Sequence, residues 1–279
     1  MHLLLATNWL LDPIVAGLTT IVGYINMGVH NLGVSLVVLA LLFRVVFWPL
    51  NAQQFKSMMA MQKISPKIKA LQNKYKGKDQ AQKLQQETMA LYKSEGVNPL
   101  AGCFPLLIQY PFIISVFYMV LQQKAIYANQ GFLWIGTAMS QHAPLIFGRV
   151  HLFAPNLAQG DAVLLVLYGL SMYVSMRYGT MPATDPAQAQ TQRMMAFLSP
   201  AMLFVIGFQY AWPSALVLYW LCSNLFQMAQ QLFMLRRFHE PFSFIDSTHV
   251  ITDDAGAPAQ ALPSGNGSSK KKNKKGAQS

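Results

Sequence analysis

The stretch Leu39-Ala40-Leu41-Leu42-Phe43-Arg44-Val45-Val46-Phe47-Trp48-Pro49 sets a single arginine inside an otherwise apolar run. Such a run suits a helix in membrane hydrocarbon, where an arginine near the centre costs about 2.5 to 3.5 kcal/mol on insertion scales. If Asn51 marks the cytoplasmic end of the run, Arg44 lies about 10 Å inside it, at 1.5 Å per residue. Its guanidinium either extends along its aliphatic stem to the headgroups or faces a water-filled cavity open to the cytoplasm. Because intramembrane charges are functional by default, we favour the cavity.

The composition of the whole chain is typical of a protein embedded in lipid. Of the 279 residues, 53% are hydrophobic and only 11% are charged, which is far from the balance of a soluble domain. Cys103 and Cys222 fall within apolar runs and have no neighbours at metal-ligand spacing. We therefore interpret both cysteines as packing residues rather than metal ligands. Separately, we expect neither a cofactor nor enzymatic activity.

Five apolar runs approach the roughly 20 residues that a helix needs to cross the hydrocarbon. The third and fourth are short, which favours little tilt or a locally thin bilayer. The sequence thus predicts an all-α integral membrane protein with five transmembrane helices, at residues 31–50, 102–122, 161–177, 194–210 and 213–235.

The distribution of basic residues predicts the orientation, because Lys and Arg collect in cytoplasmic loops. Residues 51–101 hold nine of them and residues 236–279 hold seven, whereas residues 123–160 hold two and residues 1–30 hold none. This pattern places the N-terminus outside and the C-terminus in the cytoplasm. Residues 123–160 become an extracytoplasmic loop and residues 178–193 a cytoplasmic one.

The extracytoplasmic segment of residues 1–30 contains a moderately apolar part, Trp9 to Met27, interrupted by Asp12, Pro13 and Asn26. We predict an amphipathic helix that lies on the outer membrane surface. The alternative is a sixth span, which would move the N-terminus to the cytoplasm and leave the rest unchanged.

The cytoplasmic segment of residues 51–101 predicts a helical hairpin. Apolar residues recur at spacings of three and four from Met61 to Tyr75, Gly77 interrupts them, and Leu84, Thr88 and Leu91 repeat the pattern. This hairpin is either a solvated coiled coil or a basic docking arm. The tail, residues 236–279, is rich in Ala, Gly, Pro and Ser beyond Thr252, carries five lysines between Lys270 and Lys275 and should be largely disordered. It either anchors the topology or attracts anionic lipid and ribosomal RNA.

Polar residues of other spans are candidates to line a cavity beside Arg44. In the last span the spacings from Trp220 to Gln231 are four, three and four, which places these residues on one helical face. In the second span two polar residues lie between Pro105 and Pro111, which loosen the helix. The candidates are Gln109, Tyr110, Trp220, Asn224, Gln227 and Gln231.

Three stretches closely resemble the YidC family of bacterial membrane protein insertases. They are residues 31–50 with Arg44, residues 92–109 (YKSEGVNPLAGCFPLLIQ), and residues 213–225 (PSALVLYWLCSNL), and residues 132–135 (FLWI) fit as well. The resemblance covers roughly residues 18–240 in the same order. It is specific, because the loop, proline and arginine positions agree together.

The resemblance implies five helices around a hydrophilic groove that is open to the cytoplasm and lipid and closed outside. It gives Arg44 the role of attracting a substrate's polar or acidic tail, and the second and fifth spans the role of guiding the apolar segment, with Tyr219 and Trp220 as contacts. The implied partners are nascent membrane proteins, membrane lipids, the ribosome and the Sec translocon, with no DNA, and the implied location is the bacterial inner membrane. Two departures are visible: no large folded extracytoplasmic domain precedes the core, and Ala40 replaces a hydroxyl residue one turn before Arg44.

Two other functions remain open from the sequence. A membrane-embedded assembly chaperone would use the same groove without translocating a tail. A solute transporter would normally carry acidic or histidine relays inside its spans, but here Asp161 lies at the edge of a span and no other acid enters one.

Overall fold

The structure is a computed structural model that describes residues 11–75, 77, 80–98, 104–146, 148–178 and 186–237. Residues 1–10 and the lysine-rich tail from residue 238 lie outside the described residues, so the prediction of a disordered tail stays a prediction. The predicted helical architecture is confirmed, with one short addition, an antiparallel pair of two-residue strands. The elements are α1 (Asp12–Val29), α2 (Leu32–Val46), α3 (Trp48–Lys74), α4 (Ala81–Ser94), α5 (Phe104–Gln122), α6 (Lys124–Tyr127), α7 (Ala138–Gln141), β1 (Leu145–Ile146), β2 (Val150–His151), α8 (Ala162–Tyr178), α9 (Pro186–Gln209) and α10 (Ser214–Arg237).

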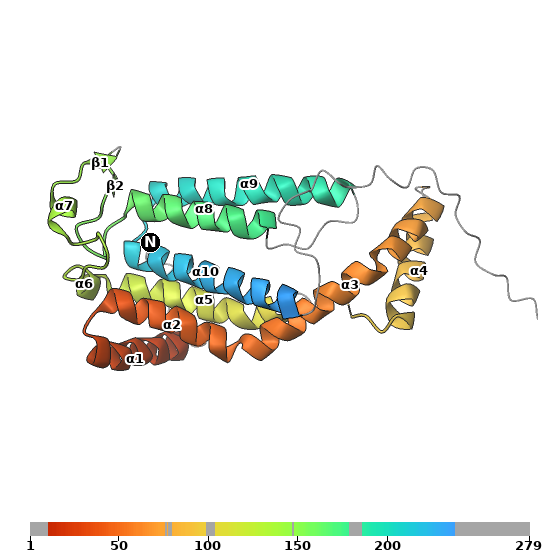
Figure 1. Ribbon diagram of the computed structural model, residues 1–279, viewed down its shortest axis with the longest axis horizontal. Helices are drawn as coiled ribbons and strands as arrows, with labels where there is room; N and C mark the ends of the chain where they lie inside the picture. Colours follow the sequence, from red (N-terminus) through yellow and green to blue (C-terminus); the bar gives the residue numbers. More distant parts are fainter. Residues whose placement is uncertain are drawn as a thin grey trace, which may run out of the picture. The chain divides into compact units, whose positions relative to one another are not determined.

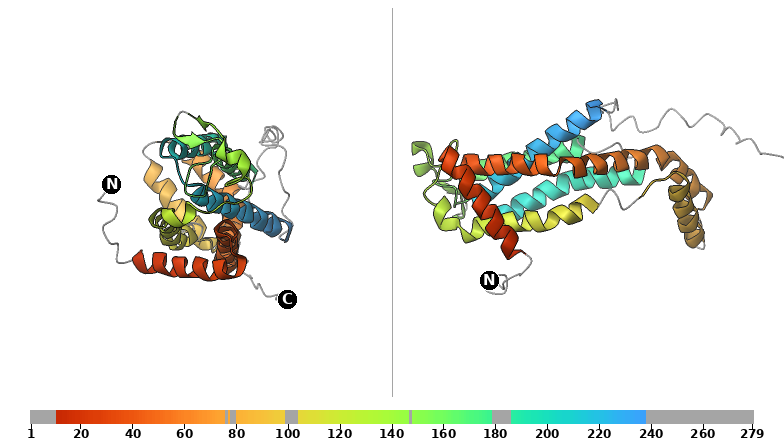
Figure 2. Two further views of the ribbon diagram at one scale, coloured as in Figure 1. Left: turned by 90° about the vertical axis from the view of Figure 1, so that its left-hand side faces the viewer. Right: turned by 90° about the horizontal axis from the view of Figure 1, so that it is seen from below.

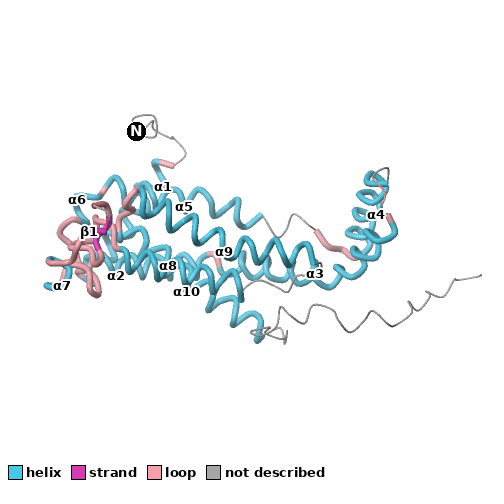
Figure 3. Tube along the Cα trace, turned by 90° about the horizontal axis from the view of Figure 1, so that it is seen from above, coloured by secondary structure: helices cyan, strands magenta, loops and turns pink. Residues whose placement is uncertain are grey.

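Five long helices run side by side: α2, α5, α8, α9 and α10 (Figure 1). Helix α10 packs against both α2 and α8, and α8 pairs with α9. The connection between α5 and α8 gathers at one end of these helices, and α3 and α4 extend from the other (Figure 3). We call these the loop end and the α3–α4 end.

Membrane-crossing capacity differs among these helices. By length and composition, one described helix, Gln190–Gln209, suffices to cross a bilayer, and Leu32–Val46 joined to Trp48–Lys74 would add a second, bent span. The stretches Leu107–Gln122 and Ala162–Arg177 are apolar but shorter. Helix α10 has the length but carries several Asn and Gln residues along its second half. Each predicted span therefore overlaps at least one described helix, and these helices differ in how well their length and composition suit a full crossing.

The first predicted span, residues 31–50, falls on two helices. Helix α2 ends at Val46 and α3 starts at Trp48, with an angle of 58° between them. Pro49 lies in the first turn of α3, where its missing N–H costs nothing, and its ring disfavours a helical conformation of the preceding residue. The break next to Pro49 thus redirects the chain a turn earlier than hydrophobicity alone indicates.

Helix α1 runs across the direction of the other helices (Figure 2). It buries Val15, Leu18 and Val22 and packs on α2 and α5, and Gln123 donates a hydrogen bond to Thr19 at 2.7 Å. Its other side leaves Tyr24 and Met27 about 70% exposed. An amphipathic helix in this position can lie in a membrane interface.

Helices α3 and α4 lie beside one another at the far end of the bundle. Lys67 of α3 forms an ion pair with Glu95, the residue that follows α4, at 2.5 Å. Both side chains are substantially exposed, so this pair contributes about 1 kcal/mol or less. Few apolar contacts hold the two helices to each other, since α4 has no buried residue.

The apolar core occupies the half of the bundle next to the loop end. In α2 the buried residues stop at Ala40, and in α10 an unbroken buried run covers Ser214–Tyr219. Between residues 107 and 122 of α5 the buried residues begin at Ser115, and between residues 162 and 177 of α8 they end at Leu165. Residues from the connection, including Tyr127, Ile135 and Leu157, complete the same core. The α3–α4 half is much less tightly packed.

Candidate functional site

Arg44 lies one turn beyond the point where the core ends. Ala40, one turn before it, is fully buried, so this position belongs to the packed half and its lack of a hydroxyl does not affect the polar surface. Arg44 itself is partly exposed, as are the neighbouring residues of α2 and α10. The loosening of the bundle at this level gives the guanidinium an environment that is neither sealed nor fully open.

The guanidinium is held by a neutral partner. Its Nη2 donates a hydrogen bond to Oε1 of Gln227 on α10, over 3.1 Å. Tyr219, which the resemblance gives as a client contact, is 5% exposed and belongs to the apolar core. Within the described residues no carboxylate lies within ion-pair distance of Arg44. The positive charge is therefore oriented by the protein and left without a counter-ion from the described chain.

A small hollow adjoins this pair. Its volume is about 70 Å³, and it is lined by polar residues of α2, α3 and α10 together with Phe55, Met58 and Met234. The polar members are Arg44, Asn51, Gln54, Gln227, Gln230 and Gln231. Two buried amide atoms, Nε2 of Gln230 and Oε1 of Gln231, have no hydrogen-bond partner among the described residues. Because such groups cost free energy unless water or a ligand satisfies them, the hollow suits a wet, polar occupant.

A short amide chain ties α5 to this hollow. Gln109 of α5 donates to Oδ1 of Asn51 at 2.8 Å, and Asn51 donates to Oε1 of Gln230 at 3.4 Å. Sequence reasoning treated Asn51 only as the end of a span and did not select Gln230. The break at Phe47 explains this, since it turns Asn51 back toward α5 and α10.

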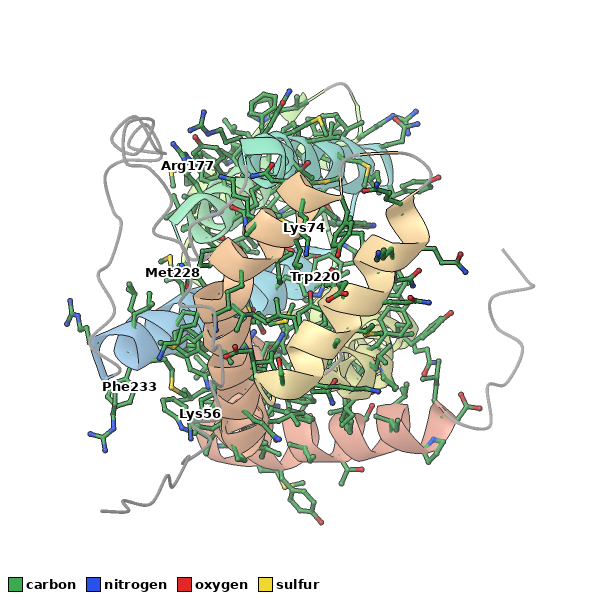
Figure 4. All side chains as sticks on the ribbon, turned by 90° about the vertical axis from the view of Figure 1, so that its right-hand side faces the viewer. Lys56, Lys74, Arg177, Trp220, Met228 and Phe233 are labelled. Atoms are coloured by element: carbon green, nitrogen blue, oxygen red, sulfur yellow. The ribbon has the colours of Figure 1, made fainter. Side chains whose placement is uncertain are left out.

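The other predicted residues do not meet at the hollow. Asn224 donates to Ser171 of α8 at 3.4 Å. Trp220 lies toward the middle of the bundle (Figure 4), against the rings of Tyr168 and Trp212. Tyr110 is 60% exposed. Because α10 packs between α2 and α8, its polar residues are divided between the two sides even though their spacing puts them on one broad face.

The loop end is closed by a polar network around Asp161, which is 2% exposed. Its Oδ2 accepts hydrogen bonds from Trp134 Nε1 at 3.0 Å and from the Ala154 N–H at 2.8 Å, and its Oδ1 accepts the N–H of Leu164 at 2.7 Å. The last bond caps the N-terminus of α8. Asp161 therefore joins two parts of the connection to the start of a helix.

Asn31 likewise joins the connection to the start of a helix, in this case α2. Its side chain accepts the N–H of Val34 at 3.0 Å and donates to the carbonyl of Gly131 at 3.1 Å. Gly33 lies against the side chain of Phe132 so closely that a Cβ would overlap it. The connection thus covers the ends of α2 and α8, while the hollow at Arg44 lies on the other side of the core.

Comparison with known proteins identifies the family. The family model described as 60Kd inner membrane protein matches residues 24–241. The membrane protein insertase MisCA of Bacillus subtilis is 36% identical over 204 residues, which are 72% of this chain and 69% of that protein. The membrane protein insertase YidC of Oceanobacillus iheyensis is 33% identical over 221 residues, 77% of each chain.

Longer relatives match over part of their length. The YidC insertase of Cellvibrio japonicus is 34% identical over 232 residues, which are 82% of this chain and 36% of that protein. A crystal structure of an active YidC insertase with its first transmembrane domain resolved has the same fold, with a TM-score of 0.55 and 24% identity over 78% of this chain and 45% of that one. With a family match over more than two thirds of its residues, the chain belongs to the 60Kd inner membrane protein family and is a YidC-type protein.

Proposed function

We propose that this protein inserts newly made proteins into the bacterial inner membrane, as the names of its relatives say of them. The action is non-enzymatic and consumes no cofactor. Five helices, α2, α5, α8, α9 and α10, cross the membrane, with the loop end outside and the α3–α4 end in the cytoplasm. Support for the crossing comes from the large apolar side chains exposed along α9, such as Phe197 and Val205, which water would not tolerate over such an area.

The proposed mechanism has three steps. The α3–α4 hairpin receives a nascent segment, Arg44 pairs transiently with the polar or acidic tail of that segment, and the apolar part slides into lipid past α5 and α10. Burying the client's apolar surface supplies about 25 cal/mol per Å², and the membrane potential favours outward movement of acidic tails. The ribosome and the Sec translocon are proposed partners, the first through the basic hairpin and tail.

One observation carries the proposal: a guanidinium oriented by neutral Gln227 beside amide groups that lack partners among the described residues. A merely structural arginine inside a membrane protein would be expected to pair with a carboxylate or backbone carbonyls. A tail carboxylate that enters the hollow would form a charge-assisted hydrogen bond with Arg44. Gln227 holds the guanidinium, and Gln109 and Asn51 position the amide of Gln230.

The test is insertion of a short single-span client into liposomes that contain the purified protein. We expect Arg44→Ala to lose about tenfold or more of the insertion rate for a client with an acidic tail, the value of one charged hydrogen bond, and Arg44→Lys to retain much of it. Arg237→Ala, which removes an exposed cation at the end of α10, is the matched control. Equal insertion by Arg44→Ala would refute the role of Arg44.

A second client separates insertion from assembly assistance. If the client's tail acids are replaced by neutral residues, the difference between the parent protein and the Arg44→Ala variant should shrink, because the charge has no partner. A reporter fused to the client's N-terminus must cross the membrane if the protein translocates tails. A chaperone that only assists assembly would leave the reporter on the cytoplasmic side.

A further inference from the structure

A second hollow lies at the loop end, between the strand pair and helices α8 and α9. Its volume is about 390 Å³, and no polar surface lines it. It is lined by Ile146 and Leu152 of the connection and by residues of α8 and α9, among them Val166, Leu167, Phe204 and Phe208. Val166 and Leu167 are 44% and 39% exposed, so the hollow opens to the surroundings of the bundle. Its size lies within the range of small-molecule sites.

An arginine stands at the rim of this hollow. Arg149 is exposed, its backbone N–H bonds the carbonyl of Ile146 at 3.2 Å, and its Nη1 donates to the backbone carbonyl of Gln209 at 3.1 Å. Ile146 lines the hollow, so the first bond places the backbone of Arg149 beside it. Gln209 follows the lining residue Phe208, so the second bond holds the guanidinium at the end of α9. A guanidinium has five N–H donors, and among the described residues only one of those of Arg149 is engaged.

The hollow and Arg149 lie at neighbouring levels along the helices, so one bound molecule can reach both. The hollow spans the first turns of α8, from Ala162 to Leu167, and the last turns of α9, from Phe204 to Phe208. At 1.5 Å per residue it reaches about 8 Å along the helices from the loop end. Arg149 lies at the level of the last carbonyls of α9, and Tyr210, which is 74% exposed, follows at the level where tyrosines concentrate in membrane interfaces.

We propose that this is a phospholipid site, in which an acyl chain fills the apolar hollow and the phosphate receives hydrogen bonds from Arg149. The site rests on the outward orientation of the loop end in the proposed function, and it does not involve Arg44. The lipid belongs to the outer leaflet. Its phosphate is the anionic partner that the exposed guanidinium lacks among the described residues, and an arginine binds phosphate in a bidentate manner.

Charge and chemistry favour a lipid over a protein occupant. Extracytoplasmic loops are normally poor in arginine, so a rim arginine at the headgroup level indicates an anion that is present there. A wholly apolar hollow offers a polypeptide backbone no hydrogen-bond partner, whereas an acyl chain needs none. Bound lipid would also fill the space between α8, α9 and the strand pair, which the protein leaves unfilled.

The test combines native mass spectrometry with photo-crosslinking on the full chain in mild detergent, supplied with phosphatidylglycerol that carries a photoactivatable acyl chain. Val166→Trp fills the hollow, and Leu170→Trp, one turn further along α8 and 56% exposed, is the matched control because it does not line the hollow. Arg149→Gln and Arg149→Lys test the rim.

We expect crosslinks on peptides that contain Val163–Leu167 or Phe204–Phe208, and one retained lipid fewer in Val166→Trp than in Leu170→Trp. Arg149→Gln should weaken retention about tenfold, the factor that 1.4 kcal/mol represents, and Arg149→Lys should weaken it less. Arg44→Ala should bind lipid normally, so failure of this site is separable from failure of the proposed function. The proposal is overturned if Val166→Trp retains as much lipid as Leu170→Trp. It is also overturned if the chain forms dimers that Val166→Trp dissociates, because a second copy would then occupy the hollow. A melting profile of Arg149→Gln equal to the parent's checks that the rim variant is folded.

Discussion

Replacing Asp161 should release the closure of the loop end. Asp161→Ala removes the acceptor of three hydrogen bonds, from Trp134, Ala154 and Leu164, at a site that is 2% exposed. Each donor left without a partner costs about 1 to 3 kcal/mol, and the lost helix cap is one of the three. We therefore expect the free energy of unfolding to fall by roughly 3 to 9 kcal/mol, toward the lower value where water reaches the donors.

Asp161→Asn should lower the free energy of unfolding less, and the positions of the three donors determine by how much. Two donors meet Oδ2 and one meets Oδ1, so the amide oxygen of Asn can replace only one of the two atoms. The better orientation keeps Trp134 and Ala154 bonded and turns the amide N–H₂ toward the N–H of Leu164. One bond and the charge are lost, which amounts to about 2 kcal/mol.

Denaturant titration in detergent micelles, followed by tryptophan fluorescence, measures both losses. The control is Asp12→Asn, which removes an exposed carboxylate from the first turn of α1 and should change the free energy by less than about 1 kcal/mol. If Asp161→Ala unfolds at the same denaturant concentration as the parent protein, the network does not hold the loop end and the reasoning fails.

Three further substitutions test the site and the core. Gln227→Glu should supply Arg44 with a permanent counter-ion over the same 3.1 Å and so lower insertion of acidic-tailed clients about as much as removing the arginine, which the liposome assay measures; insertion at the parent rate would show that the charge is not used. Gly33→Ala should cost about 1 to 3 kcal/mol in denaturant titration, because its methyl group overlaps Phe132, and an unchanged midpoint would contradict the close approach. Burial raises the pKa of Tyr127 to about 12, and its hydroxyl has no partner among the described residues, so Tyr127→Phe should leave the free energy of unfolding unchanged or raise it by about 1 kcal/mol; a clear loss would indicate a hidden hydrogen bond.

The sequence predicts where helices form better than it predicts which of their side chains meet. Apolar runs and the interruption at Gly77 indicate where most of the long helices lie, because hydrophobic periodicity and helix-breaking residues act locally. They do not indicate the break between α2 and α3. The pair of Arg44 and Gln227 was within reach, since a buried charge demands a polar neighbour. Asn51 and Gln230 were not selected, because their meeting depends on the bend at Phe47 and on which helices flank α10.

The loop end was the least predictable part. Asp161 was noted only as an acid at the edge of a span, yet it organises the connection through donors 27 residues before it, 7 before it and 3 after it. No periodic pattern signals such a network, since Trp134, Ala154 and Asp161 lie outside the long helices. The apolar hollow beside Arg149 likewise arises from the way the strand pair sits over α8 and α9.

The polar groups at the two ends of the bundle differ in their surroundings: those near Arg44 adjoin a hollow, whereas the Asp161 carboxylate at the loop end is buried and accepts three hydrogen bonds. This difference gives the proposed route a direction. At the α3–α4 end, Gln230 and Gln231 carry amide atoms without partners among the described residues, so an arriving polar tail gains hydrogen bonds there and displaces only water. At the loop end, passage through the bundle would break the bonds of Asp161 before it formed any. On the proposed mechanism, a tail that leaves the hollow would have its lowest barrier along the lipid side of α5 and α10, where the client's own apolar segment would offset the cost of moving charge. For clients with long, strongly charged tails, the cost of moving the charge exceeds the free energy gained by burying the apolar segment. We expect insertion of such clients to need a second protein complex.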